Sequence, residues 1–495
     1  MCSMAPDQNA LDFVNRDRLR TTFASAMSSM YRAEVPLYGD LINIVRDINE
    51  KTSQSSFQND QEKDDSAIVT SSERLTLERH GAIRLGTPYE LQTIRRILAL
   101  LGLEPVGYYD LSIAGLPMHA TCFRPISVPS LDLNPFRVFT TLLRPELLAS
   151  AESRRLALEL LDKREIFSDA LLGILTTAEA QCGRLTEIQA KIFIPEALAT
   201  FSWKPLAAAT FDQYQILKTE HPILADIACF QSAHINHLTP RALDISAVQS
   251  AMKASGMAVK AHIEGPPPRN CPILLRQTSF LALEEAVQFK QNDSDHGRDV
   301  GASQPQEPLI MSNHKARFGE IEQRGAAVTP KGRLLYDQLL HECKRRATGV
   351  DADEVDAIAL KVFQQYPDSW TELRKQGLIY CHFNCDQTSF QESTLDPNDG
   401  SLLEQLIAKG AVKAFPITYE DFLPFSAAGI FQSNLQLGNQ PNESLGLTHS
   451  SSDQNGFEEA LGGKVFDLDR WYSNVQQQSL ERVGNRLGLA FEALM

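Results

Sequence analysis

Apolar residues recur at helical spacing close to the start of the chain. Their intervals, near one or two helical turns, predict packed helices over residues 15–49. Residues 51–72 are polar and rich in Ser, Gln and Asp, which is typical of a flexible connection. The apolar positions that carry the helical pattern are Phe23, Met27, Met30, Leu37 and Ile42.

The clearest single helix begins after Thr87. This residue supplies a capping hydroxyl, Pro88 suits the first helical position and Glu90 places a carboxylate at the third. An apolar face follows at helical spacing, and Gly102 suits the end of the helix. The residues of that face are Leu91, Ile94, Ile97, Leu98 and Leu101.

Two further helix starts are predicted at Thr239-Pro240 and at Asp244, with the second helix running to Gly256. Extended segments alternate with these helices, and strand, helix and further strands recur around two histidine-bearing segments. The pattern indicates mixed α and β structure. Two polar stretches crowded with Asn, Ser, Gln, Gly and Pro are expected to be surface loops, residues 291–313 and 438–455.

This organisation divides the 495 residues into three parts. Residues 1–72 are expected to form an N-terminal helical segment with its flexible connection. A catalytic core with helical insertions follows over residues 73–435. A surface loop and a C-terminal helix that packs on the core complete the chain over residues 436–495.

Composition and charge exclude several classes of protein. The chain is 43% hydrophobic, yet it has no run of eighteen apolar residues and no signal-peptide pattern at its start, so we expect a soluble, intracellular, cytoplasmic protein. Lys and Arg total 47 against 62 Asp and Glu, a net charge of 47 − 62 = −15. Neither a nucleic acid nor a membrane is therefore expected as a partner.

The eight cysteines are scattered and indicate reduced, buried thiols. In Cys381-His382-Phe383-Asn384-Cys385 three soft ligands stand close together, but no second cysteine pair completes a tetrahedral zinc site. A half-buried strand is the preferred interpretation of this segment.

The segment around His80 is predicted to be a strand, because it is too short and too interrupted by glycine to form a helix. Alternation then places His80, Ala82 and Arg84 on one face, with the Cα atoms of His80 and Arg84 about 13 Å apart. If His80 held a metal, Arg84 could grip an anionic group some bonds away from the metal-bound end of a substrate. Taken alone, His80 is more typical of a structural histidine than of a metal ligand.

Two further segments carry possible metal ligands. His234 and His237 stand just before a predicted helix, and strand alternation lets only one of them face inward. Glu320, Glu322 and Arg324 alternate along a third predicted strand. That strand presents either an ion-paired exterior face or a carboxylate ligand beside a cation.

Two imidazoles and one carboxylate from separate strands are the ingredients of the facial triad that binds non-haem iron and leaves open positions for substrate and oxygen. A zinc hydrolase uses the same ligand types. Residue chemistry alone leaves both options open.

Four segments together resemble one family, the 2-oxoadipate dioxygenases/decarboxylases, also called hydroxyglutarate synthases. The resemblance runs from about Arg18 to the C-terminus, and four matches in order are more specific than a single histidine motif. The segments are His80–Arg84 (HGAIR), Asn236–Arg241 (NHLTPR), Phe318–Gly325 (FGEIEQRG) and Phe422–Phe431 (FLPFSAAGIF).

The resemblance implies an α+β fold with a vicinal-oxygen-chelate-like half-barrel sheet elaborated with helices. It also implies an iron(II) enzyme of lysine catabolism that converts 2-oxoadipate and O2 into 2-hydroxyglutarate and CO2. The implied metal ligands are His80, His237 and Glu320. The alternatives are a divalent-metal hydrolase or isomerase, or a non-catalytic binding protein, on the same scaffold.

The remaining residues follow from the same resemblance. Arg84 is expected to bind substrate, and Phe425 and Ser426 fall where the family contacts substrate largely through its backbone. Glu320 is favoured over Glu322 because this segment also resembles the last strand of 4-hydroxyphenylpyruvate dioxygenases, where the first Glu is the ligand. The other candidates are His234 as the substitute for His237, His119 as a fourth ligand and Arg124 as a second carboxylate contact.

Overall fold

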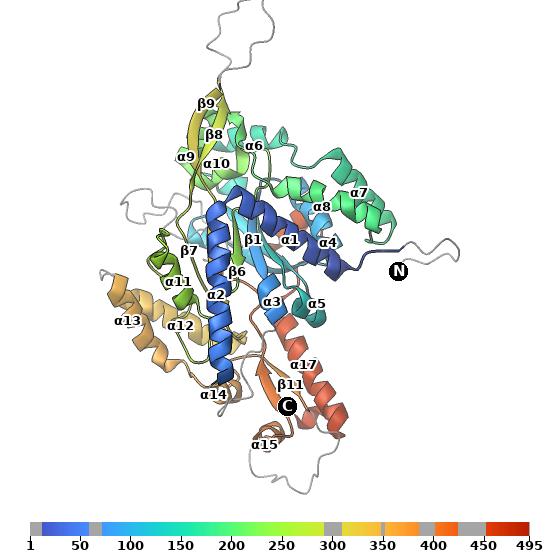
Figure 1. The fold of residues 1–495 in the computed structure, drawn as a ribbon, viewed down its shortest axis with the longest axis vertical. Coiled ribbons are helices and arrows are strands. Elements are labelled where there is room, and N and C mark those ends of the chain that lie inside the picture. Colours follow the sequence, from blue (N-terminus) through green and yellow to red (C-terminus); the bar gives the residue numbers. More distant parts are fainter. Residues whose placement is uncertain are drawn as a thin grey trace, which may run out of the picture.

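The structure is a computed structural model that describes residues 12–58, 72–291, 309–347, 352–385, 401–423 and 452–494. It combines helices with a curved seven-stranded sheet in the order β2-β3-β4-β1-β6-β10-β7 (Figure 1). The predicted α+β class, with a half-barrel sheet elaborated by helices, is confirmed.

The first half of the sheet is one strand-helix-strand-strand-strand unit. Its first strand pairs in parallel with its last, and the two middle strands follow antiparallel at the outside. The elements are β1 (Arg79–Leu85), α4 (Pro88–Leu100), β2 (Glu104–Asp110), β3 (Met118–Arg124) and β4 (Arg137–Leu143).

The second half follows a similar plan but contributes three strands to the sheet instead of four. Strand β6 pairs in parallel with β10, and β10 pairs antiparallel with β7. The halves join where β1 and β6 run antiparallel, so the strands that carry His80 and His237 are neighbours at the centre of the sheet. The elements are β6 (His237–Pro240), α11 (Ile245–Ala254), β7 (Leu275–Ser279) and β10 (Phe318–Arg324).

Helices from both ends of the chain pack around the central sheet. Helix α1 (Arg16–Glu34) packs against α8 (Glu187–Phe201), and α2 (Pro36–Gln58) lies against α11 and β10 (Figure 1). Near the other end, α17 (Leu468–Leu487) packs along β11 (Cys381–Asn384), which pairs with β12 (Lys413–Pro416). Segments far apart in sequence therefore enclose the sheet.

The other elements form the periphery. A small sheet of the order β5-β8-β9 consists of β5 (Leu206–Thr210), β8 (Glu284–Lys290) and β9 (Leu309–Lys315). The other helices are α3 (Ser72–Leu77), α5 (Val128–Leu133), α6 (Ala151–Asp162), α7 (Asp169–Ala180), α9 (Phe211–Glu220), α10 (Pro222–Ala228), α12 (Pro330–Arg346), α13 (Ala352–Val362), α14 (Trp370–Lys375), α15 (Leu402–Ala408) and α16 (Gln454–Leu461).

Two of the three helix starts are confirmed. Helix α4 begins after Thr87, whose side chain forms a capping box with Glu90. Helix α11 begins after Asp244, whose side chain accepts a hydrogen bond from the backbone N–H of Ala247. The predicted start at Thr239-Pro240 is wrong, because both residues belong to strand β6. Pro240, which has no backbone N–H to donate, is the last residue of that strand.

Three other expectations change. Residues 51–58 continue helix α2 rather than forming a connection, and residues 309–313 belong to strand β9 rather than to a loop. The described cysteines form no disulfide, but Cys182 is exposed where a buried thiol was expected. None of the described helices has an apolar stretch of the length that a bilayer crossing requires. The division into three parts stays a prediction.

Gly325, directly after β10, lies against the backbone of residues 272 and 273. A Cβ atom built there would overlap the backbone of Pro272 and Ile273, which no side-chain rotation can relieve. We expect Gly325→Ala to lower the free energy of unfolding by about 1–3 kcal/mol. Urea denaturation measures this change. Gly173→Ala on α7 is the matched control, because nothing lies within 4 Å of its added Cβ; an equal loss in both variants would contradict the role of close packing.

Candidate metal centre

Three neighbouring strands bring His80, His237 and Glu320 together. His80 is the second residue of β1, His237 the first of β6 and Glu320 the third of β10. Each side chain offers one ligand atom, and the three atoms lie within 4.8 Å of one another. Among the described residues, these three are the group of His, Cys, Asp or Glu side chains that is close enough to hold a metal ion. The sequence-based grouping of these residues is therefore realised in space.

The three side chains are almost completely removed from solvent. Their exposed fractions are 1% for His80, 1% for His237 and 0% for Glu320. Nε2 of His80 lies 3.0 Å from Oε1 of Glu320, and Nε2 of His237 lies 3.9 Å from the same oxygen. The imidazole rings meet edge to face with centroids 5.4 Å apart. All three side chains therefore point at one small volume.

The hydrogen bonding of these side chains tests whether a metal fits. Both ring nitrogens of His237 and Oε2 of Glu320 are buried without a hydrogen-bond partner among the described residues. Buried polar atoms without partners are costly, and a divalent cation would satisfy one ring nitrogen of His237 together with Oε2 of Glu320. Two imidazole nitrogens and a carboxylate are also the donor set of non-haem iron. The residues present therefore fit a metal ion.

The pKa values of His237 and Glu320 agree with ligands kept ready for a cation. Burial would lower the pKa of His80, but Glu322 and then Glu320 raise it above its ordinary value. Burial lowers the pKa of His237 to about 4, and the positive charges of His80, Arg84 and Lys260 add to the effect. Burial would raise the pKa of Glu320, but His237 and then His80 hold it below its ordinary value. A neutral imidazole and an ionised carboxylate are the forms that bind metals.

Glu322 takes a different position from Glu320. Its Oε2 lies 2.9 Å from Nδ1 of His80, on the opposite side of the imidazole ring from Glu320. Arg324 grips the same carboxylate with two hydrogen bonds of 2.8 Å. Burial opposes ionisation, yet Arg324 and then His80 bring the pKa of Glu322 to about 2. Glu322 is therefore placed to orient His80. Of the two alternatives for this strand, the exterior face is wrong, since Glu320, Glu322 and Arg324 are all buried.

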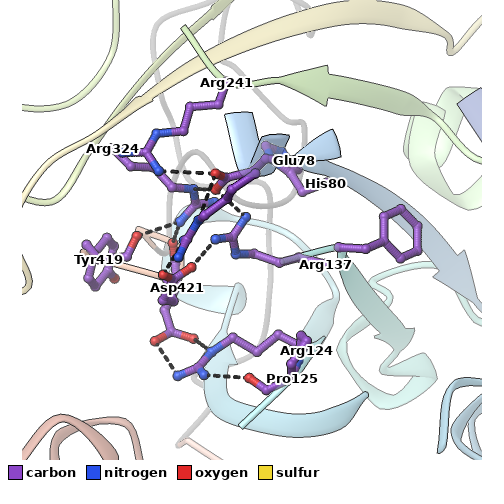
Figure 2. A network of polar contacts seen from close by, with 12 residues as sticks. Glu78, His80, Arg124, Pro125, Arg137, Arg241, Arg324, Tyr419 and Asp421 are labelled. Atoms are coloured by element: carbon purple, nitrogen blue, oxygen red, sulfur yellow. Dashed lines mark hydrogen bonds and ion pairs between the residues drawn. The ribbon is translucent and has the colours of Figure 1, made fainter. Parts of the chain in front are cut away.

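A buried ionic network occupies one end of the central strands (Figure 2). Glu78, fully buried before β1, lies 2.9 Å from Arg137 at the start of β4 and 3.1 Å from Arg241 after β6. Arg324, at the end of β10, approaches Glu78 to 3.8 Å. Three arginines from different strands therefore converge on one carboxylate, two residues from His80.

A C-terminal segment completes this network. Glu420 forms ion pairs with Arg74 and Arg137, and its neighbour Asp421 accepts two hydrogen bonds from Arg124, of 2.7 and 2.9 Å. The Arg124–Asp421 pair is visible in Figure 2. Arg124 is fully buried by this pairing, so the structure places it in an internal ion pair.

Arg84 lies at the opposite end of β1. Its guanidinium forms an ion pair of 2.5 Å with Asp226 on α10. His234 also bonds to Asp226, at 3.2 Å, and so lies outside the group formed by His80, His237 and Glu320. Arg84 and His234 therefore share a separate cluster that borders the metal centre.

The other sequence-based candidates lie elsewhere. His119 contacts Tyr108 and the ring of Phe457 and is not part of the metal-ligand group. The segment beginning at Cys381 forms strand β11, as expected. Phe425 and Ser426 lie outside the described residues. The last residues described before them include Phe422, whose ring packs on His80 with centroids 4.9 Å apart.

Sequence reasoning missed several residues around the centre. Gln277 on β7 and Thr239 on β6 donate hydrogen bonds of 2.7 and 3.1 Å to Oε1 of Glu320. Thr239 belongs to the segment Asn236–Arg241 that resembles the family, but the sequence assigned it no role. Gln277 lies in the short polar strand β7, and no sequence pattern indicates that it contacts a metal ligand. Asp226 was equally unmarked, because its partners come from distant parts of the chain.

Comparisons with known proteins match this chain almost throughout. Residues 23–434 match the family model of 2-oxoadipate dioxygenase/decarboxylase. The proteins of that name from Shigella flexneri and Pseudomonas putida are 45% and 44% identical, over 95% and 97% of this chain and 99% of each relative. The crystal structure of the hydroxyglutarate synthase in complex with 2-oxoadipate from Pseudomonas putida superposes with a TM-score of 0.80 at 42% identity, covering 97% of this chain and all of that one.

Metal binding tests the centre directly. We expect His237→Gln to lose bound metal after reconstitution, because one of three buried ligands is removed, whereas His234→Gln should keep it. Metal analysis and the rise in melting temperature on adding Mn(II) measure binding, since a ligand at a hundred times its Kd stabilises a protein by about 2.7 kcal/mol. Loss of metal from His234→Gln with retention by His237→Gln would contradict the assignment.

Proposed function

This chain belongs to the 2-oxoadipate dioxygenase/decarboxylase family, and we propose that it is an iron(II)-dependent enzyme that converts 2-oxoadipate and O2 into 2-hydroxyglutarate and CO2. The observation that carries the proposal is the buried group of His80, His237 and Glu320 with its unsatisfied donor atoms. The relative that superposes over 97% of this chain was crystallised with 2-oxoadipate, which supports this substrate. We propose that the reaction belongs to lysine catabolism.

The overall reaction balances without another reactant. A six-carbon 2-oxo diacid and dioxygen give a five-carbon 2-hydroxy diacid and carbon dioxide. Ferrous iron held by His80, His237 and Glu320 supplies the redox chemistry with oxygen that protein side chains lack. Three protein ligands leave coordination positions open, which suits an enzyme rather than a structural metal site.

The chain itself contributes placement and exclusion of water. Glu322 contacts Nδ1 of His80, and Gln277 and Thr239 donate hydrogen bonds to Glu320. These contacts fix the metal-binding atoms of His80 and Glu320 before a metal ion binds. We place Arg84 at the far carboxylate of the substrate, because it lies on the same face of β1 as His80 and its charge reaches His237. Phe425 and Ser426 are proposed as further substrate contacts.

The choice of metal separates this proposal from its alternatives. We expect chelated protein to consume oxygen and form 2-hydroxyglutarate from 2-oxoadipate when reloaded with Fe(II), but not with Zn(II), because zinc has no accessible redox step. An oxygen electrode and product chromatography measure both. Oxygen-independent turnover with zinc would indicate a hydrolase or isomerase. Binding of 2-oxoadipate to the Fe(II) protein without any turnover would indicate a binding protein.

Arg84 should determine how strongly the diacid is used. We expect Arg84→Ala to lower kcat/KM for 2-oxoadipate, because a charge-assisted contact is lost, while iron content stays unchanged. The loss should correspond to an activation free energy that is higher by on the order of 2 to 5 kcal/mol. Arg84→Lys keeps the charge opposite Asp226 and should restore part of the activity, since an ammonium cannot form the planar fork. Steady-state kinetics with 2-oxoadipate and 2-oxohexanoate measure the effect. Equal losses on both acids would make Arg84 structural.

A further inference from the structure

A cluster of buried polar side chains surrounds Asp226 on α10. Oδ2 of Asp226 accepts hydrogen bonds from Nη1 of Arg84 at 2.5 Å and from the amide of Asn236 at 3.3 Å. Its Oδ1 lies 3.2 Å from Nε2 of His234 and 2.9 Å from Nε2 of His314 on β9. Four side chains from three separate segments therefore converge on one carboxylate.

The surroundings of Asp226 leave its carboxylate little freedom. Its side chain is 5% exposed, and aromatic rings border the cluster: Trp203 packs edge to face on His234, and the hydroxyl of Tyr214 lies 3.0 Å from Nδ1 of His314. Burial would raise the pKa of Asp226, but Arg84 and then His234 hold it well below its ordinary value. The carboxylate is therefore a fixed anion rather than a solvated one.

Arg84 is only partly used by this contact. Its side chain is 8% exposed, and its Nε is buried without a hydrogen-bond partner among the described residues. A guanidinium offers five donors in a planar fork, so one end can be held by Asp226 while other donors face a second anion. Without Asp226, the same long side chain would sample many rotamers.

We propose that Asp226 is a positioning residue that sets the preferred chain length of the 2-oxo diacid. It does so by holding the guanidinium of Arg84 at a fixed distance from the metal centre. The proposal rests on the proposed function, in which Arg84 binds the far carboxylate. Strand β1 fixes the Cα atoms of His80 and Arg84 about 13 Å apart, and Asp226 removes the freedom that remains in the arginine side chain. A diacid one carbon shorter or longer then misses one of its two contacts.

The test compares diacids of different length on the full-length, Fe(II)-loaded protein. The substrates are 2-oxoglutarate, 2-oxoadipate and 2-oxopimelate, with 2-oxohexanoate as the acid that lacks a far carboxylate. We expect Asp226→Asn to reduce the preference for 2-oxoadipate over both other diacids at least tenfold, the range that one methylene commonly commands. The change should appear mainly in KM. Anaerobic calorimetry of the same diacids gives the preference independently of turnover.

Asp226→Glu is the second variant, because it keeps the buried charge and is expected to fold. It moves the carboxylate by one bond, about 1.5 Å, and should also reduce the preference for 2-oxoadipate. Glu404→Gln is the matched control: it removes the carboxylate that binds Arg374 with two hydrogen bonds between α14 and α15, and should leave the preference unchanged.

The outcomes separate this proposal from the proposed function. An unchanged length preference in folded Asp226 variants, or an equal loss on all four acids, would overturn the positioning role while leaving the oxygenase intact. A wild-type protein that uses all three diacids equally would overturn it as well. Failure of the wild-type protein to turn over 2-oxoadipate, with calorimetry still showing length-dependent binding that Asp226→Glu alters, would overturn the proposed function alone.

Discussion

The structure around the metal centre depends on one constraint, which is that charges buried in the sheet must neutralise one another. Glu78, Glu320, Glu322 and Glu420 are all almost completely buried, and removing a carboxylate from water costs several kcal/mol unless a cation compensates. Arginines from the ends of neighbouring strands provide that compensation for three of these carboxylates. Glu320 differs, because neutral donors and histidines face it and one of its oxygens has no hydrogen-bond partner among the described residues. Charge balance thus leaves this position for a metal cation.

The sequence predicts the local part of this arrangement well. Period-two alternation places His80 and Arg84 on one face of a strand, and the capping signals fix the helix that follows it. Alternation also puts Glu320 and Glu322 on one face of β10, but it cannot say whether that face is buried. Part of that face is covered by residues 419–422, which contact Arg324 and His80, and no property of the strand predicts this covering segment. Convergence of Arg137 and Glu420, 283 residues apart, is likewise invisible before folding.

The segment from His234 to His237 shows how closely two functions can be interleaved. Its first histidine bonds to Asp226, its last points at Glu320, and Asn236 between them also reaches Asp226. Strand β6 begins only at His237, so the preceding residues are free to turn toward α10. Because His234 and His237 are three residues apart, alternation predicts that only one of the two imidazoles faces the metal centre, and this is what the structure has. The predicted helix start at Thr239 would have destroyed the pairing of β6 with β1, which the structure retains through Pro240.

The same ionic network that stabilises the sheet also holds residues 420 and 421 against it. Glu420 and Asp421 are neighbours in the chain but reach different arginines, Arg137 and Arg124. The hydroxyl of Tyr472 on α17 accepts a hydrogen bond from the backbone of Glu420 and donates one to Asp421. Breaking such buried pairs costs about 3–5 kcal/mol, which holds this segment firmly against the sheet. Phe422 thereby rests on His80, and the backbone that continues from it starts beside the metal centre.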